Sequence, residues 1–134
     1  MGPGTPPAPA TLYGERIAEH WKHPRNHGPL AAPDVSREEL NPLCGDRLRL
    51  ELKVAGGVIT AARFRGDACM VATASASLLT TALQGLPVAE AAAFDQERLL
   101  ALLGGPLRPA RVACALLVLT ALREGLRARG GGAQ

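Results

Sequence analysis

The stretch over residues 47–54 constrains the fold of this 134-residue chain more than any other part of the sequence. Its side chains alternate strictly: Leu48, Leu50, Leu52 and Val54 are apolar, and Arg47, Arg49, Glu51 and Lys53 are charged. Such a period of two predicts a β-strand with one packed face and one face in water. The turn "AGG" and a second apolar stretch over residues 58–65 follow, so we expect an antiparallel hairpin.

The other segments predict helices around this hairpin. We expect helices over residues 12–23, 70–84, 88–93, 96–103 and 109–129, and a short strand near Val35. In the first helix, Tyr13, Ile17 and Trp21 recur every four residues and predict its buried face. Because strands and helices come in separate runs, the predicted fold class is α+β. We expect a small antiparallel sheet of about three strands, covered by helices.

The composition supports one domain with an aliphatic core. Hydrophobic residues make up 47% of the chain and aromatic residues only 3%, so leucine, alanine and valine must fill the core. We expect a single domain over residues 12–129, between a flexible Pro-rich tail at 1–11 and a flexible tail at 130–134.

The charge and the hydropathy exclude other classes of protein. The net charge is +3 with scattered arginines, so no nucleic-acid partner is expected. No stretch is long and apolar enough to cross a membrane, and the first residues lack a secretion signal, so a cytoplasmic location is expected.

The segment "NPLCGD" places Cys44 in an exposed bend, because Pro42 and Gly45 both favour a turn. The chain has three cysteines, which cannot all pair with one another. In a reducing compartment, metal or redox chemistry is then favoured over a disulfide framework. Cys69 and Cys114 are each predicted near the start of a helix, where the helix dipole lowers the pKa of a thiol.

Asp46 joins the cysteines as a candidate ligand. Side chains two residues apart on an extended segment point the same way, so Cys44 and Asp46 can bind the same ion. The same parity continues into the apolar face at Leu48, which predicts a site at the rim between the sheet and the helices. Three sulfurs and one carboxylate suit zinc or an iron–sulfur cluster. From spacing alone, three unrelated cysteines are slightly favoured over one site, most of all for Cys114 with its apolar neighbours.

Other polar groups have plainer interpretations. His20, His23 and His27 could bind a metal, but they are interpreted as the solvated end of the first helix. Ser75 and Ser77 indicate close helix packing rather than a nucleophile.

Four segments in this order resemble one known family: "LYGERIAEHWKHPRNHGPL", "NPLCGDRLRL", "FRGDACMVATASAS" and "RPARVACALLVLTAL". They are similar to the IscU/SufU/NifU N-terminal family of iron–sulfur cluster assembly proteins, over about residues 12–125. The resemblance implies that Cys44, Cys69 and Cys114, with Asp46, bind zinc or a nascent [2Fe–2S] cluster. It also implies that a thiolate accepts persulfide sulfur from a cysteine desulfurase of the SufS or IscS type. The expected role is an assembly scaffold or a zinc-dependent sulfur relay that serves apo iron–sulfur proteins. Such a protein is not an enzyme by itself.

Two features depart from the IscU pattern. Ala113 stands where IscU-type proteins carry a histidine, and "LRPARVA" at residues 107–113 replaces the LPPVK-type stretch. The chaperone that recognises the LPPVK stretch is therefore not an expected partner. Both changes are more similar to SufU, yet the segment over residues 85–109 is too short for the insertion that SufU carries.

Access decides which thiol takes sulfur first. We predict Cys44 as the first sulfur acceptor because it lies on the bend, with Cys114 as the alternative. Two other functions stay open from the residues: a zinc-stabilised binding module without sulfur transfer, and a thiol-based enzyme.

Overall fold

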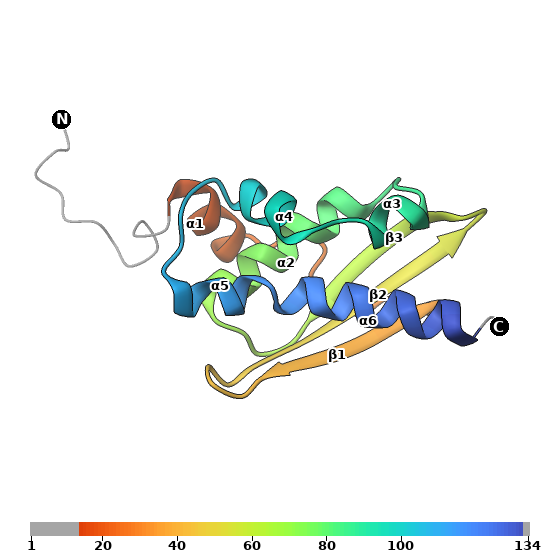
Figure 1. Cartoon of the computed structure of the whole chain (residues 1–134), viewed down its shortest axis with the longest axis horizontal. Coiled ribbons are helices and arrows are strands. Elements are labelled where there is room, and N and C mark those ends of the chain that lie inside the picture. Colours follow the sequence, from red (N-terminus) through yellow and green to blue (C-terminus); the bar gives the residue numbers. More distant parts are fainter. Residues whose placement is uncertain (1–13, 133–134) are drawn as a thin grey trace, which may run out of the picture.

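The computed structural model of the chain describes residues 14–132 and has an α+β architecture (Figure 1). The elements in chain order are α1 (Glu15–Lys22), β1 (Val35–Asn41), β2 (Asp46–Ala55), β3 (Val58–Arg65), α2 (Met70–Leu83), α3 (Val88–Ala92), α4 (Gln96–Leu103), α5 (Pro109–Ala115) and α6 (Leu117–Gly132). The predicted fold class is confirmed. Within residues 14–132, no helix is both long enough and apolar enough to span a membrane.

The sheet is an antiparallel meander in the order β1-β2-β3. Asn41 pairs with Asp46, so β1 and β2 form a hairpin closed by the four residues between them. The predicted hairpin of β2 and β3 is confirmed, with a register irregularity between Lys53 and Val54. The short strand expected near Val35 extends over seven residues and completes a three-stranded sheet.

One face of the sheet packs against α2 and α6 (Figure 1). The alternating leucines of β2, Leu48, Leu50 and Leu52, are fully buried there. They join a core cluster that includes Leu79 of α2 and Leu122 of α6. The alternation read from the sequence therefore assigns the packed face correctly, because β side chains alternate between the two faces of a sheet.

A second layer of helices packs on α2. Ile17 of α1, Val71 of α2, Leu103 of α4, and Cys114 and Ala115 of α5 share a buried cluster. Ser75 and Ser77 are fully buried between the helices, which confirms the prediction of close packing. This second cluster places Cys114 inside the fold, beneath the β1–β2 turn.

Two predicted helices differ in the structure. The helix expected over residues 109–129 is broken at Leu116, so Cys114 lies near the end of α5 and not near the start of a long helix. At the break, the Ser75 hydroxyl donates a 2.7 Å hydrogen bond to the Ala115 carbonyl; a side chain that bonds a helix carbonyl is a known cause of kinks. In α1, Ile17 is buried as expected, but Trp21 is 42% exposed.

The ends of the predicted domain compare only in part with the structure. Tyr13 and the predicted tail at residues 1–11 lie outside the described residues. At the other end, α6 continues to Gly132, past the helix end predicted at residue 129.

Candidate metal centre

The turn between β1 and β2 presents Cys44 to solvent. The backbone N–H groups of Cys44 and Gly45 both donate to the Asn41 carbonyl, at 3.2 and 2.8 Å. The Leu43 N–H donates to the Asn41 side-chain oxygen at 3.2 Å. Gly45 has a φ of +73°, a left-handed conformation that a residue without Cβ adopts at little cost. One asparagine thus fixes the whole turn, and Cys44 is a free, exposed thiol at its tip.

Asp46 is the first residue of β2 and is only 4% exposed. Its Oδ1 atom accepts a 2.8 Å hydrogen bond from the backbone N–H of Cys69. Its Oδ2 atom is buried and has no hydrogen-bond partner among residues 14–132. A buried carboxylate oxygen without a partner is costly, and such an atom is typical of a site that takes up a cation.

Gly66 brings Cys69 close to Asp46. The residues directly after β3 run closely beside the start of β2, where the Arg47 N–H donates to the Asp67 carbonyl at 2.8 Å. A Cβ atom on Gly66 would lie 2.1 Å from the Arg47 carbonyl oxygen, and its φ is +141°. Only glycine fits this close approach of the two backbones. The approach positions the start of α2 beside the β1–β2 turn.

Cys114 approaches the turn from α5. Its Sγ atom lies 3.1 Å from the Sγ of Cys44, and both cysteines are free thiols. Ligand atoms of Cys44, Asp46 and Cys114 all lie within 4.8 Å of one another. Cys44 and Asp46 therefore lie close together as predicted, but Cys44 lies in the turn and not on an extended segment. The group lies at the rim where the sheet meets the helices.

The pKa of Cys114 moves opposite to the expectation from sequence. Burial raises the pKa of the Cys114 thiol, and the neighbouring thiols of Cys44 and Cys69 raise it further. The prediction of a low-pKa thiol at a helix start is wrong for Cys114, because its side chain is fully buried and burial disfavours the thiolate. A bound cation is the means by which such a thiol becomes a thiolate.

Cys69 is placed as predicted, at the N-cap of α2, where its sulfur accepts from the Ala72 N–H at 3.5 Å. It lies outside the tight group of three ligand atoms. Its thiol is nevertheless close enough to Cys114 to raise the pKa of that group through a hydrogen bond. Cys69 therefore contributes its backbone N–H to Asp46 and keeps its sulfur beside the site.

Two polar side chains that the sequence reasoning missed also reach Cys114. Asn41 Nδ2 and Arg111 Nη1 each donate to the Cys114 sulfur at 3.9 Å. Arg111 lies one helical turn before Cys114, and this i, i+3 spacing was a usable signal once residues 109–115 were read as helix. Asn41 gave no such signal, because its contact depends on the hairpin.

The histidines lie away from the cysteines. His20 Nδ1 lies 2.7 Å from the Ser77 hydroxyl, so His20 links α1 to α2 and is not part of a freely solvated helix end. His27 packs edge-on against Phe64. In the part of the chain that the structure describes, the group of possible metal ligands contains no histidine.

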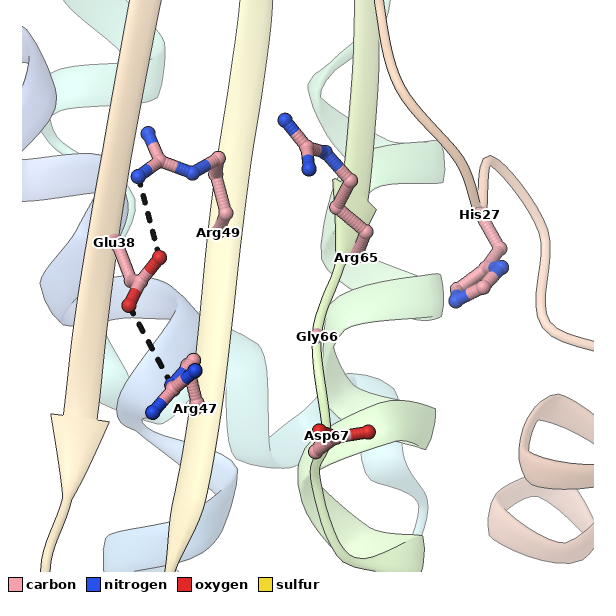
Figure 2. A pocket seen from close by; sticks show the side chains of 7 residues that line it. All are labelled: His27, Glu38, Arg47, Arg49, Arg65, Gly66 and Asp67. Carbon is pink, nitrogen blue, oxygen red and sulfur yellow. Dashed lines mark hydrogen bonds and ion pairs between the residues drawn. The ribbon is translucent and has the colours of Figure 1, made fainter.

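A separate pocket of about 380 Å³ lies on the outer face of the sheet, opposite the helices (Figure 2). Glu38 bridges Arg49 and Arg47, at 3.2 and 3.6 Å, and Arg65 pairs with Glu51 at 3.4 Å. Each of these arginines already has a carboxylate partner. The pocket therefore has little uncompensated charge with which to attract a ligand.

The sequence of the chain matches a known family. A family model described as the NifU-like N terminal domain matches residues 12–129. The chain belongs to this family. The match spans α1 to α6 and includes all three cysteines, so the family recognised from four sequence segments is confirmed.

Relatives of two kinds resemble this NifU-like chain. The zinc-dependent sulfurtransferase SufU of Bacillus subtilis (strain 168) is 34% identical over 139 residues, which cover 91% of this chain and 94% of the relative. The iron-sulfur cluster assembly scaffold protein IscU of Azotobacter vinelandii is also 34% identical, over 86% of this chain and 91% of the relative. The crystal structure of a nitrogen-fixing NifU-like protein (N-terminal) from Brucella abortus superposes with a TM-score of 0.72 at 26% identity, covering 87% of this chain and 92% of that chain.

The alignment with SufU agrees with one departure seen in the sequence. It runs over 139 residues although it covers 91% of a 134-residue chain, so the relative has residues that this chain lacks.

Proposed function

We propose that this NifU-like protein serves iron–sulfur cluster assembly by accepting sulfur on Cys44 at a metal centre. One observation carries the proposal: Cys44 is exposed, whereas the two groups nearest to it, Asp46 and Cys114, are buried. A store for metal would enclose all its ligands. A site with one accessible sulfur suits transfer to and from partners, because access decides which thiol reacts.

The residues present fit a zinc ion. Cys44, Asp46, Cys69 and Cys114 would hold it, and the partnerless Oδ2 of Asp46 supports a cation there. When bound, zinc keeps cysteine ligands as thiolates at neutral pH. This matters most for Cys114, whose pKa is otherwise raised by burial. The name of the Bacillus subtilis relative, a zinc-dependent sulfurtransferase, also supports zinc as the metal at this site.

The transfer step is a thiolate exchange. The Cys44 thiolate attacks the outer sulfur of a donor persulfide, and a bond forms between Cys44 Sγ and that sulfur. The sulfur–sulfur bond of the donor breaks, and its electron pair leaves with the donor cysteine as a thiolate. No external oxidant or reductant is needed. Attack by the Cys114 thiolate instead would require the donor persulfide to pass the turn that covers Cys114.

The partners follow from this chemistry. A cysteine desulfurase of the SufS or IscS type would supply the persulfide, and apo iron–sulfur proteins would be the final acceptors. The protein would carry sulfur and would not be an enzyme by itself. The word sulfurtransferase in the name of one relative fits a protein that receives sulfur and passes it on.

The scaffold role is a second candidate, supported by the names of the IscU relatives. The same three sulfurs and the Asp46 carboxylate would hold a [2Fe–2S] cluster as cargo. A carboxylate is a hard ligand that binds a soft or borderline centre less tightly than thiolate does. Asp46 would therefore favour release of the cluster to an acceptor.

A sulfur-loading experiment tests the proposal. The zinc-loaded protein is mixed with a cysteine desulfurase and cysteine, and mass spectrometry locates the added sulfur. We expect persulfide on Cys44, and none on the other cysteines at an early time. In Cys44→Ser, persulfide on Cys114 at the wild-type rate would overturn the assignment to Cys44. A wild-type protein that binds zinc but takes no sulfur would instead be a zinc-stabilised binding module.

A further inference from the structure

The surface beside Cys44 combines an exposed leucine with an unpaired arginine. A pocket of about 440 Å³ opens next to the thiol and is lined by Leu43, Cys44, Arg108, Ala110 and Arg111. Leu43 is 94% exposed. No hydrogen bond or ion pair joins the Arg108 side chain to any other residue in the range 14–132.

Exposure of a leucine is common on protein surfaces and proves nothing alone. Leu43 differs because it is held in place: its own N–H and the N–H groups of the next two residues all bond to Asn41. The backbone that carries Leu43 is therefore already ordered before a partner arrives. Docking then costs less conformational entropy than it would on a flexible loop, which suits a docking anchor.

Arg108 adds a charge to the same rim. It is the N-cap residue of α5 and is exposed, so its guanidinium keeps a full positive charge beside the pocket. On the outer face of the sheet, by contrast, Arg47 and Arg49 share Glu38, and Arg65 has Glu51. Charge complementarity therefore favours an acidic partner at the Leu43 rim over one at the sheet face.

We propose that Leu43 and Arg108 form the docking surface for the protein that delivers sulfur to Cys44. The inference rests on the proposed function. Leu43 would enter an apolar socket next to the persulfide-bearing loop of the donor, and Arg108 would pair with a carboxylate at the edge of that socket. Since Leu43 directly precedes Cys44 in the turn, its docking brings the donor's outer sulfur to the accessible thiol.

The test measures persulfide formation on Cys44 at increasing concentrations of this protein, with a cysteine desulfurase and cysteine as donor. We expect Leu43→Ser to raise KM by about tenfold or more, because the buried area of one leucine side chain is lost from the complex. Leu40→Ser is the matched control, since Leu40 is also exposed, at 57%, but does not line the pocket. Its KM should stay within about twofold of wild type.

A charge pair of variants tests the arginine. Arg108→Glu should raise KM, and added salt should reduce the difference from wild type. Arg63→Glu makes the same charge change on the outer face of the sheet and should have a smaller effect. An equal effect of Arg63→Glu would show that overall charge or the outer face attracts the donor, and would overturn the proposed surface.

Two controls separate docking from other effects. Glutathione persulfide, a small donor, should load Cys44 equally fast in wild type and Leu43→Ser; an equal slowing with both donors would place the defect at the thiol and overturn the docking role. Loss of zinc in Leu43→Ser would assign Leu43 to the stability of the turn itself, which would also overturn the docking role.

If wild type loads sulfur and Leu43→Ser does so with the same KM, the docking surface is wrong and the proposed function stands. If wild type itself takes no sulfur, both fail.

Discussion

The backbone N–H of Cys69 donates a 2.8 Å hydrogen bond to Oδ1 of Asp46, across 23 residues of sequence. This bond ties the start of α2 to the start of β2, and it leaves the second carboxylate oxygen buried without a partner among residues 14–132. The same carboxylate is therefore both a structural acceptor and a candidate metal ligand. Changes at this contact should affect stability and metal chemistry separately, because each depends on a different oxygen.

Asp46→Ala should make a bound [2Fe–2S] cluster longer-lived, by severalfold, because the hard carboxylate that favours release is gone. It should also cost about 1–3 kcal/mol of folding free energy, since the Cys69 N–H loses its acceptor. Anaerobic reconstitution, followed by transfer to an apo-acceptor, measures the lifetime. Asp67→Ala is the control, because Asp67 is a carboxylate two residues before Cys69 but lines the outer pocket (Figure 2). Faster cluster loss in Asp46→Ala would contradict this account.

Gly66→Ala should destabilise the fold by at least about 2 kcal/mol, because the new Cβ meets a backbone carbonyl at a strained φ. That Cβ would lie 2.1 Å from the Arg47 oxygen. Gly57→Ala is the matched control: its φ is +77°, but nothing lies within 4 Å of the new Cβ. Urea unfolding compares the two. If both variants lost the same free energy of unfolding, backbone strain alone would explain the loss. The close contact with the Arg47 carbonyl would then not require glycine.

Removal of the metal should lower the melting temperature. Zinc held by Cys44, Asp46, Cys69 and Cys114 ties the β1–β2 turn, α2 and α5 together, so a chelator should lower Tm by at least about 5 °C. In Cys69→Ser, zinc content should fall and the chelator should have little further effect. Serine is itself a favourable N-cap, so the start of α2 is preserved and the loss reports on the metal. Equal zinc content and equal Tm in wild type and variant would refute the ligand set.

The sequence predicted those parts of the fold that depend on local patterns. Alternation identified the packed face of β2. The proximity of Cys44 and Asp46 was predicted from an extended segment, whereas the structure brings them together through the turn at residues 42–45. The role of Gly66 could not be predicted, because it depends on how closely the residues after β3 approach the backbone of β2. The break at Leu116 has no proline or glycine to announce it. It accompanies a hydrogen bond from Ser75, which lies 40 residues away in the chain.

The error at Cys114 came from its burial. Its position near a helix start predicted a low pKa, whereas the structure buries its side chain between the helices and raises its pKa. The approach of Asn41 and Arg111 to its sulfur likewise depends on tertiary contacts between the hairpin and α5. The resemblance to a known family, rather than spacing, was what grouped Cys114 with Cys44 before the structure showed them together.

His20 should make the stability of the fold depend on pH. Burial lowers the pKa of His20 from its usual 6.5, and the charge of Arg25 lowers it further. As the pH falls below that usual value, the unfolded chain takes up a proton at His20 before the folded chain does. The contribution of His20 is thus fully present above about pH 6.5 and is lost as the pH falls toward the lower folded pKa.

Urea unfolding between about pH 7.5 and pH 5.5 measures this effect as a change in the free energy of unfolding. In His20→Asn the free energy should fall less over this range, because the group that links α1 to Ser77 no longer titrates. His23→Asn is the control, since His23 is an exposed residue that directly follows α1. The metal ligands titrate alike in all three proteins, so the difference between the curves isolates His20. An unchanged curve for His20→Asn would show that the contact with Ser77 does not couple protonation to folding.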